Sequence, residues 1–240
     1  MNVRSIVLAS VFSALVFTAT LISVSTPITK GYFNLGESMV YTAAIIGGPA
    51  VGAVAGGLGS SLADIYLGYG DYAPGTLIIK GVEGFLVGLL FKALSRIPRD
   101  KWKRYSIILA LIAGAGISVA GLILYGGLYG GNTELVLWGK TYKFTIPAPA
   151  WVMLGVIVAI VIIYTSFRVE SLIAGAVLSM MLGGLEMVAG YFIYEYAILG
   201  YGISAAAEIP INIGQALVGT VISVFIISTV YRAGAGIDRG

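Results

Sequence analysis

Long apolar runs separated by short polar connections extend over almost the whole chain of 240 residues. An α-helix needs about 20 predominantly apolar residues to cross a bilayer, and most of the runs reach this length. The pattern therefore predicts an all-α polytopic membrane protein that forms a single membrane domain over residues 1–240. The runs cover about residues 6–24, 39–62, 74–94, 107–125, 150–167, 172–198 and 205–231.

The second run is interrupted by Gly47-Gly48-Pro49, and the placement of basic residues decides how it crosses. Arg and Lys cluster at residues 96–104, and such clusters lie on the cytoplasmic side of a membrane. A single crossing by residues 39–62 would place this cluster outside. We therefore predict a tight turn at Gly48-Pro49 between two short spans. The chain then crosses the cell membrane eight times, with both termini in the cytoplasm.

Composition narrows the possible chemistry. Charged residues make up 10% of the chain and hydrophobic residues 58%, whereas soluble domains carry roughly 25% charged residues. No stretch is polar enough for a soluble domain, so we expect a lipid bilayer and no nucleic acid as partner. Cys and His are both absent, which removes thiol nucleophiles, imidazole bases and the commonest zinc ligands. A Gly-rich nucleotide-binding loop is also missing from the sequence. From these missing groups we expect no enzymatic activity, no metal site and no cofactor.

Lys80 and Glu83 lie inside the run at 74–94, three residues apart and therefore on one face of a helix. Ionisable side chains at membrane depth cost a few kcal/mol or more, so they usually face a protein interior or an aqueous pocket. Two interpretations remain open. The pair forms a salt bridge that only fixes helix packing, or one or both charges line a ligand site.

Further polar side chains lie at the same predicted depth, in the outer half of the membrane and in the adjoining outer loops. Polar groups from several segments at one depth favour a pocket open to the outside, with tyrosines for stacking and amides for hydrogen bonding. A purely structural polar network is the alternative. The candidate substrate-binding residues are Asn34, Glu37, Asp64, Tyr72, Lys80, Glu83, Tyr191, Glu195, Glu208, Asn212 and Gln215.

Several short segments stand in one order along the chain. They are Tyr32-Phe33-Asn34-Leu35-Gly36-Glu37, Gly48-Pro49, Gly56-Gly57-Leu58-Gly59, Leu62-Ala63-Asp64, Pro74 to Gly84, and Glu208-x-Pro210-x-Asn212-x-x-Gln215. Together they resemble the substrate-binding S components of energy-coupling factor (ECF) vitamin transporters, especially the riboflavin-type group. The resemblance covers about residues 1–98 and 170–232. We predict that residues 105–167 are an inserted pair of spans, with an outer hairpin that turns near Gly139-Lys140.

This resemblance implies a six-helix membrane protein that captures a vitamin or vitamin precursor from outside. It implies docking onto a transmembrane coupling protein driven by two ATPase subunits, followed by toppling in the membrane to release the cargo. Small residues in the first helix form the docking face in this family, which maps here to Ala9, Ser13 and Ala14. Riboflavin and pyrimidine precursors of thiamin both remain open as ligands.

Two other functions compete with this interpretation. An ion-coupled secondary transporter could use Lys80 and the glutamates at 186, 195 and 208 as a relay, although only a faint repeat connects the two halves of the chain. Gly68-Tyr69-Gly70-Asp71 matches the Gly-x-Gly-Asp pattern of intramembrane aspartyl proteases, whose two carboxylates share a proton. This segment is predicted to lie in a loop rather than at helix depth, which weakens the match.

Overall fold

The computed structural model describes residues 1–25, 31–124, 133–137, 140–144, 148–168 and 171–233, and the described part is almost entirely helical. Five helical stretches there are long and apolar enough to cross a membrane: Val3–Thr20, Pro49–Leu67, Lys101–Val119, Leu172–Ile198 and Gly202–Arg232. The prediction of an all-α polytopic membrane protein is confirmed. The α-helices are α1 (Val3–Thr20), α2 (Gly36–Gly47), α3 (Pro49–Leu67), α4 (Ala73–Leu94), α5 (Arg99–Leu124), α6 (Ala148–Arg168), α7 (Ser171–Ile193) and α8 (Ile209–Arg232).

The chain divides into two compact units. The first consists of Met1–Arg96 with Gly175–Gly240, and the second consists of Ile97–Ala174. The first unit holds α1 to α4, most of α7, and α8. It also holds the strands β1 (Ser23–Ser25) and β2 (Tyr32–Asn34), the π-helical turn η1 (Tyr194–Ile198) and the 3-10 helix η2 (Gly202–Glu208). The division resembles the predicted core and insertion, but whether residues 105–167 are an insertion stays a prediction.

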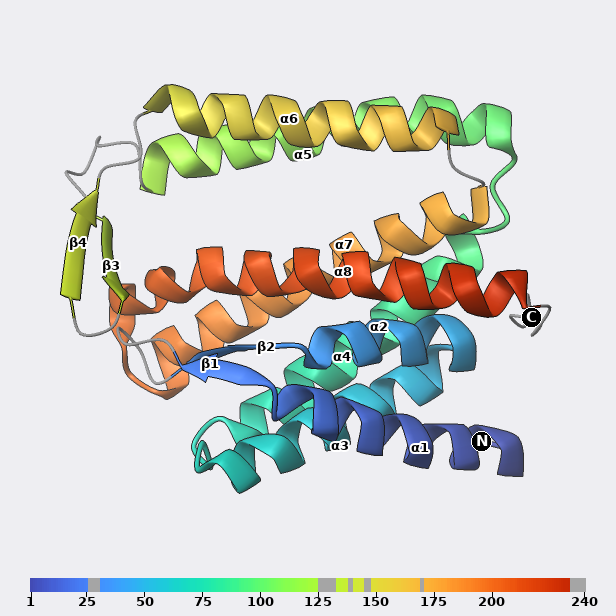
Figure 1. The fold of residues 1–240 in the computed structure, drawn as a ribbon, viewed down its shortest axis with the longest axis horizontal. Coiled ribbons are helices and arrows are strands. Elements are labelled where there is room, and N and C mark those ends of the chain that lie inside the picture. Colours follow the sequence, from blue (N-terminus) through green and yellow to red (C-terminus); the bar gives the residue numbers. More distant parts are fainter. Residues whose placement is uncertain (26–30, 125–132, 138–139, 145–147, 169–170, 234–240) are drawn as a thin grey trace. The chain divides into compact units, whose positions relative to one another are not determined.

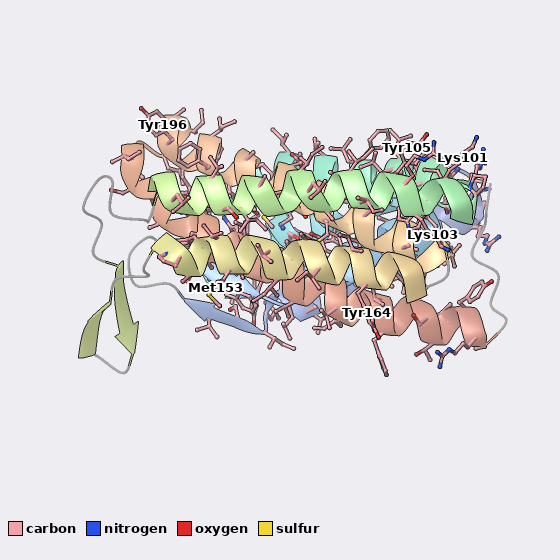
Figure 2. All side chains as sticks on the ribbon, turned by 90° about the horizontal axis from the view of Figure 1, so that it is seen from above. Lys101, Lys103, Tyr105, Met153, Tyr164 and Tyr196 are labelled. Carbon is pink, nitrogen blue, oxygen red and sulfur yellow. The ribbon has the colours of Figure 1, made fainter. Side chains whose placement is uncertain are left out.

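The second unit consists mainly of α5 and α6 with the strands β3 (Thr133–Leu137) and β4 (Lys140–Phe144). The two helices approach closely, because a Cβ atom on Gly155 would lie 2.3 Å from the carbonyl oxygen of Gly114. Figure 2 shows Lys101 and Lys103 at one end of α5. The predicted hairpin is confirmed by the antiparallel pairing of β3 with β4. Residues 138–139, in its predicted turn, lie outside the described residues.

The predicted break at Gly48-Pro49 is confirmed. Gly48 has φ of +81° between the end of α2 and the start of α3, a conformation that glycine adopts without the steric cost of a Cβ atom. Pro49 occupies the first turn of α3, where its missing N–H group would have no helical partner in any case. Together the two residues end one short helix and start the next.

Glycines bring α3 and α4 into close contact. A Cβ atom on Gly84 would lie 2.2 Å from the carbonyl oxygen of Gly52, and one on Gly56 would lie 2.5 Å from the carbonyl oxygen of Lys80. Small residues allow helix backbones to approach in this way inside membranes. The Gly56 contact fixes α3 against the turn of α4 that carries Lys80, and it therefore helps to position that side chain.

The strands, turns and irregular helices of the first unit lie together at one end of it. Figure 1 shows the β1–β2 hairpin, the α3–α4 connection and the η1–η2 region at one end, while the start of α1 and the α2–α3 turn lie at the other. The sequence pattern predicted only a short polar connection between the first two apolar runs. Instead, Ser23 pairs with Asn34, Val24 with Phe33 and Ser25 with Tyr32, so backbone hydrogen bonding holds this segment in a defined register.

The predicted docking face on α1 needs a correction at Ala9. Ala9 is buried in an apolar cluster with Phe12 and Val16, because α1 packs along α2 and α3. It therefore packs inside the unit and does not face outwards. Ser13 is half-buried, whereas Ala14 is exposed. Of the three predicted docking residues, only Ala14 is fully accessible to a partner in this structure.

Candidate substrate-binding cavity

A polar cavity lies within the first unit, and most of the predicted site residues form its wall. The atom-free space amounts to about 440 Å³, counting the open space at its mouth. The predicted residues that line it are Asn34, Asp64, Tyr72, Lys80, Tyr191, Glu195, Glu208, Asn212 and Gln215. Residues that were not predicted complete the lining: Thr20, Gly31, Tyr32, Ser60 and Thr76.

Lys80 is the centre of a buried ionic group. Its Nζ atom contacts the Oε1 atom of Glu37 and donates a hydrogen bond of 3.1 Å to the Oε2 atom of Glu83. Glu83 also accepts a hydrogen bond of 3.0 Å from the hydroxyl of Tyr41. The ammonium of Lys80 lies 5.5 Å from the ring centre of Tyr191, within the range of a cation–π contact. The predicted pair is therefore a trio, and Glu37 and Glu83 lie behind the wall and hold Lys80.

An amide network connects three segments that are distant in sequence. Gln215 on α8 donates a hydrogen bond of 3.0 Å to the Oε1 atom of Glu37 on α2. Its Oε1 atom accepts bonds of 2.8 Å and 2.9 Å from the backbone and side-chain nitrogens of Asn34 on β2. The Oδ1 atom of Asn34 accepts a bond from the backbone nitrogen of Gly36 at 2.8 Å. This network fixes the hairpin and α8 beside the ionic group.

Tyr32 brings the hairpin into contact with Asp64 near the end of α3. Its hydroxyl donates a hydrogen bond to the Oδ1 atom of Asp64, and its ring stacks on Tyr69 with 4.7 Å between ring centres. Burial, together with the negative charge of Asp64, raises the pKa of the Tyr32 phenol well above its usual range. The phenol therefore stays protonated at neutral pH and acts as a hydrogen-bond donor.

Glu195 approaches the cavity from the π-helical turn η1. The turn is marked by a hydrogen bond of 3.0 Å from the backbone nitrogen of Leu199 to the carbonyl oxygen of Tyr194, and turns of this type are frequent at functional sites. The hydroxyl of Tyr72 lies 3.4 Å from the Oε1 atom of Glu195. Burial, followed by the charge of Glu195, raises the pKa of Tyr72, so this phenol also remains a donor.

Gly31 shows why one unpredicted residue belongs to the lining. A Cβ atom at this position would lie 2.5 Å from the Oε1 atom of Glu208, so the absence of a side chain leaves room for that carboxylate. The sequence offers no periodic signal for this contact, because Gly31 and Glu208 are 177 positions apart (208 − 31). The signal for Tyr32 was present, since it opens the segment on which the family resemblance partly rests.

The cavity has the character of a binding site. Its wall combines aromatic rings, amides and charged groups from α3, α4, η1 and α8 with the hairpin. Among the described residues, no group of three or more Asp or Glu side chains has the geometry to hold a metal ion. Buried polar side chains that line one open cavity in a helical membrane protein are typical of membrane proteins that bind small molecules.

Comparison with known proteins identifies the family. The family model for "ECF-type riboflavin transporter, S component" matches residues 1–163. The chain is 37% identical over 118 residues to an uncharacterized protein of Pyrococcus woesei, covering 47% of this chain and 74% of that protein. It is 29% identical over 127 residues to the thiamine precursor transporter HmpT of Lactococcus lactis, covering 52% of this chain and 71% of the transporter. The chain belongs to the family of S components of ECF-type riboflavin transporters.

The predicted resemblance is therefore confirmed, and with it the assignment to membrane-embedded vitamin uptake proteins. The family is a transporter family and not an enzyme family. The matched range 1–163 runs through most of the segment 105–167, and it does not separate this segment from the rest of the chain. The inserted pair of spans stays a prediction.

Proposed function

We propose that this protein is the high-affinity binding subunit for uptake of a small vitamin or vitamin precursor across the cell membrane. The ligand enters the cavity of the first unit from outside and is bound without chemical change. The N- and C-termini lie in the cytoplasm. The best support is the convergence of predicted polar residues from α3, α4, η1 and α8 on one cavity in a member of an S-component family.

The wall of this cavity combines polar side chains that are held in place by neighbouring residues with aromatic rings. Lys80 is held by Glu37 and Glu83, and Gln215 is held by its bonds to Glu37 and Asn34. These side chains are thereby ordered before a ligand arrives, which reduces the entropy that binding costs. Tyr72 and Tyr191 offer aromatic surface on the same wall, which suits a flat ring.

Transport needs energy from other subunits in this proposal. The sequence has no nucleotide-binding loop, and a separate module supplies ATP hydrolysis through a transmembrane coupling protein with two ATPase subunits. The exposed apolar face of α1, which includes Ala14, Val7 and Val11, is the surface proposed for docking.

Uptake into proteoliposomes tests this function. Vesicles that contain the protein alone should bind the vitamin but should not accumulate it, with or without an imposed proton or sodium gradient. Vesicles that also contain the coupling protein and ATPases should accumulate it when ATP is supplied. Accumulation driven by a gradient in the protein alone would refute the proposal and establish an ion-coupled secondary transporter.

The protease alternative has a separate readout. The aspartate of the Gly-x-Gly-Asp segment, Asp71, lies in the exposed connection between α3 and α4 and not within a helix, where such an enzyme would carry it. Peptide cleavage by the purified protein, abolished by Asp71→Asn, would overturn the transport proposal. We expect no cleavage by either protein.

A further inference from the structure

A second cavity lies in the first unit, at the end opposite the substrate cavity. Its atom-free space amounts to about 980 Å³, counting the open space at its mouth. The wall is formed by the start of α1, the end of α2, the start of α3 and the end of α4. Figure 1 shows the start of α1 and the α2–α3 turn together, away from the β1–β2 hairpin. None of the candidate substrate-binding residues belongs to this wall.

The charged side chains on this wall are all basic. Arg4 on α1 and Lys92 on α4 line the cavity, and none of the described residues that line it carries a carboxylate. Asn2 and Ser5 add polar groups from the same end of α1 as Arg4. The two cations are 88 positions apart (92 − 4), so the fold places them on one wall. An anionic group inside the cavity would be attracted by both side chains.

The packing of α4 against the α2–α3 turn positions Lys92. A Cβ atom on Gly88 would lie 2.6 Å from the backbone nitrogen of Pro49, so α4 packs directly against the start of α3. A Cβ atom on Gly48 would lie 4.0 Å from the Cε atom of Lys92, and the aliphatic stem of the lysine therefore lies beside this turn. No side chain caps the N-terminus of α3, and its partial positive charge adds to the attraction for an anion.

The other part of the wall is apolar. The hydrophobic side chains that line it are Leu8, Ile45, Ile46 and Phe91. Val3 and Ile6, on the same end of α1, are more than half exposed. Because a candidate membrane span begins at Val3, these two side chains lie where the span meets the membrane boundary. A ligand that combines an anionic group with apolar chains would match both parts of the wall.

We propose that this cavity binds an anionic phospholipid. Arg4 and Lys92 contact its phosphodiester headgroup, and the apolar side chains contact its acyl chains. Basic pockets between transmembrane helices on the cytoplasmic side are typical sites for acidic lipid headgroups. The proposed topology places the start of α1 in the cytoplasm, so the lipid belongs to the cytoplasmic leaflet. A soluble phosphate ester shares the headgroup chemistry but cannot use the apolar wall. The site is separate from the substrate cavity and does not depend on the identity of the vitamin.

Native mass spectrometry of the full-length protein tests the site. The protein is freed of lipid by detergent exchange and titrated with phosphatidylglycerol or phosphatidylcholine, which carry the same acyl chains and differ in headgroup charge. We expect one phosphatidylglycerol to be retained per chain, with an affinity on the order of 10-fold above that of phosphatidylcholine, because two basic side chains act on its net charge. Inorganic phosphate and glycerol 3-phosphate are the soluble probes, and neither should displace the lipid at equal concentration.

Variants separate the effect of charge from that of shape. Arg4→Gln with Lys92→Gln removes both cations and should abolish most of the preference for phosphatidylglycerol. Ala50→Trp keeps both cations and fills part of the cavity from an exposed position, so it should weaken the retention of both lipids. Arg232→Gln is the matched control, because it removes a basic side chain in the last turn of α8, outside this cavity lining.

Each outcome supports or overturns the lipid site. Equal retention of the two phospholipids by the wild-type protein would overturn it, and so would an unchanged preference in the folded double variant. Displacement of the lipid by inorganic phosphate or glycerol 3-phosphate would indicate a site for a soluble anion instead. Undiminished lipid retention in Ala50→Trp would place the lipid elsewhere on the protein. Vitamin affinity should be the same in all these variants, so failure of the lipid site leaves the proposed function intact.

Discussion

The trio of Lys80, Glu37 and Glu83 gives a stability prediction that a simple pair does not. All three side chains are essentially buried, with exposures of 3%, 1% and 0%. Lys80→Met removes the one cation of the trio and leaves two carboxylates close together. Breaking a buried ion pair by removing one partner typically costs about 3–5 kcal/mol. We expect Lys80→Met to lose at least this much, because it leaves two carboxylates uncompensated.

Multiple replacements distinguish a trio from a pair. In Lys80→Met with Glu83→Gln, the carboxylate of Glu37 still lacks its cation, so the double variant should recover only part of the loss. Adding Glu37→Gln removes the last uncompensated charge, and the triple variant should recover most of it. Gln at position 37 can still accept the hydrogen bond of 3.0 Å that Gln215 donates to the Oε1 atom of Glu37, and Gln at position 83 can still accept from Tyr41.

Thermal unfolding in a fixed detergent measures the series. Lys92→Met is the control, because Lys92 lies on the same helix but is exposed, and it should change the midpoint little. Wild-type stability of Lys80→Met would show that the buried charges are not coupled. Complete recovery in the double variant would show that Glu37 contributes nothing and that the sequence-based pair was the whole interaction.

Three further predictions address other parts of the fold. Burial raises the pKa of Tyr32 and Tyr72 above the ordinary value of about 10, so Tyr→Phe at either position should leave the ultraviolet titration up to about pH 11 unchanged. Because the two phenols keep their protons more tightly in the folded protein than in the unfolded chain, the free energy of unfolding should fall as the pH rises above about 10. Gly84→Ala should lower the midpoint of thermal unfolding by overpacking α3 against α4, whereas Gly70→Ala should not, because a Cβ atom there meets nothing within 4 Å. Ala14→Leu should reduce ATP-driven uptake with the partner subunits present and leave ligand affinity unchanged, since bulk on an exposed helix face separates a docked helix. An equal loss of uptake and of ligand affinity would contradict the docking role.

Much of the helical framework could be predicted because its signals are local. Apolar length predicted the spans, and the combination of Gly48 and Pro49 with the basic cluster at 96–104 predicted two short helices in place of one long span. The glycine contacts between α3 and α4 were not predicted as a specific interface, because glycine content alone does not state which helices approach. Ala9 was misassigned for a related reason, since a small residue suits internal packing and external docking equally.

The sequence predicted most of the polar side chains that line the cavity, but it did not predict which side chains contact each other. Lys80 and Glu83 are three positions apart, so helix geometry predicts their contact. Glu37 and Gln215 are separated by 178 positions, and no local rule connects them. Tyr32 opens a segment that carries the family resemblance, but its contact with Asp64 depends on the β1–β2 pairing, which was not predicted. Glu195 gains its place on the cavity wall from a π-helical turn that the sequence pattern did not predict either.

Direct measurement of the bound molecule tests the central claim most directly. Native mass spectrometry of the full-length protein, released from detergent after incubation with a mixture of water-soluble vitamins, reports both the mass and the stoichiometry of what is retained. The account predicts one vitamin or precursor per chain, recovered with its mass unchanged. A protein that retains no vitamin, or that returns a ligand of altered mass, would contradict it.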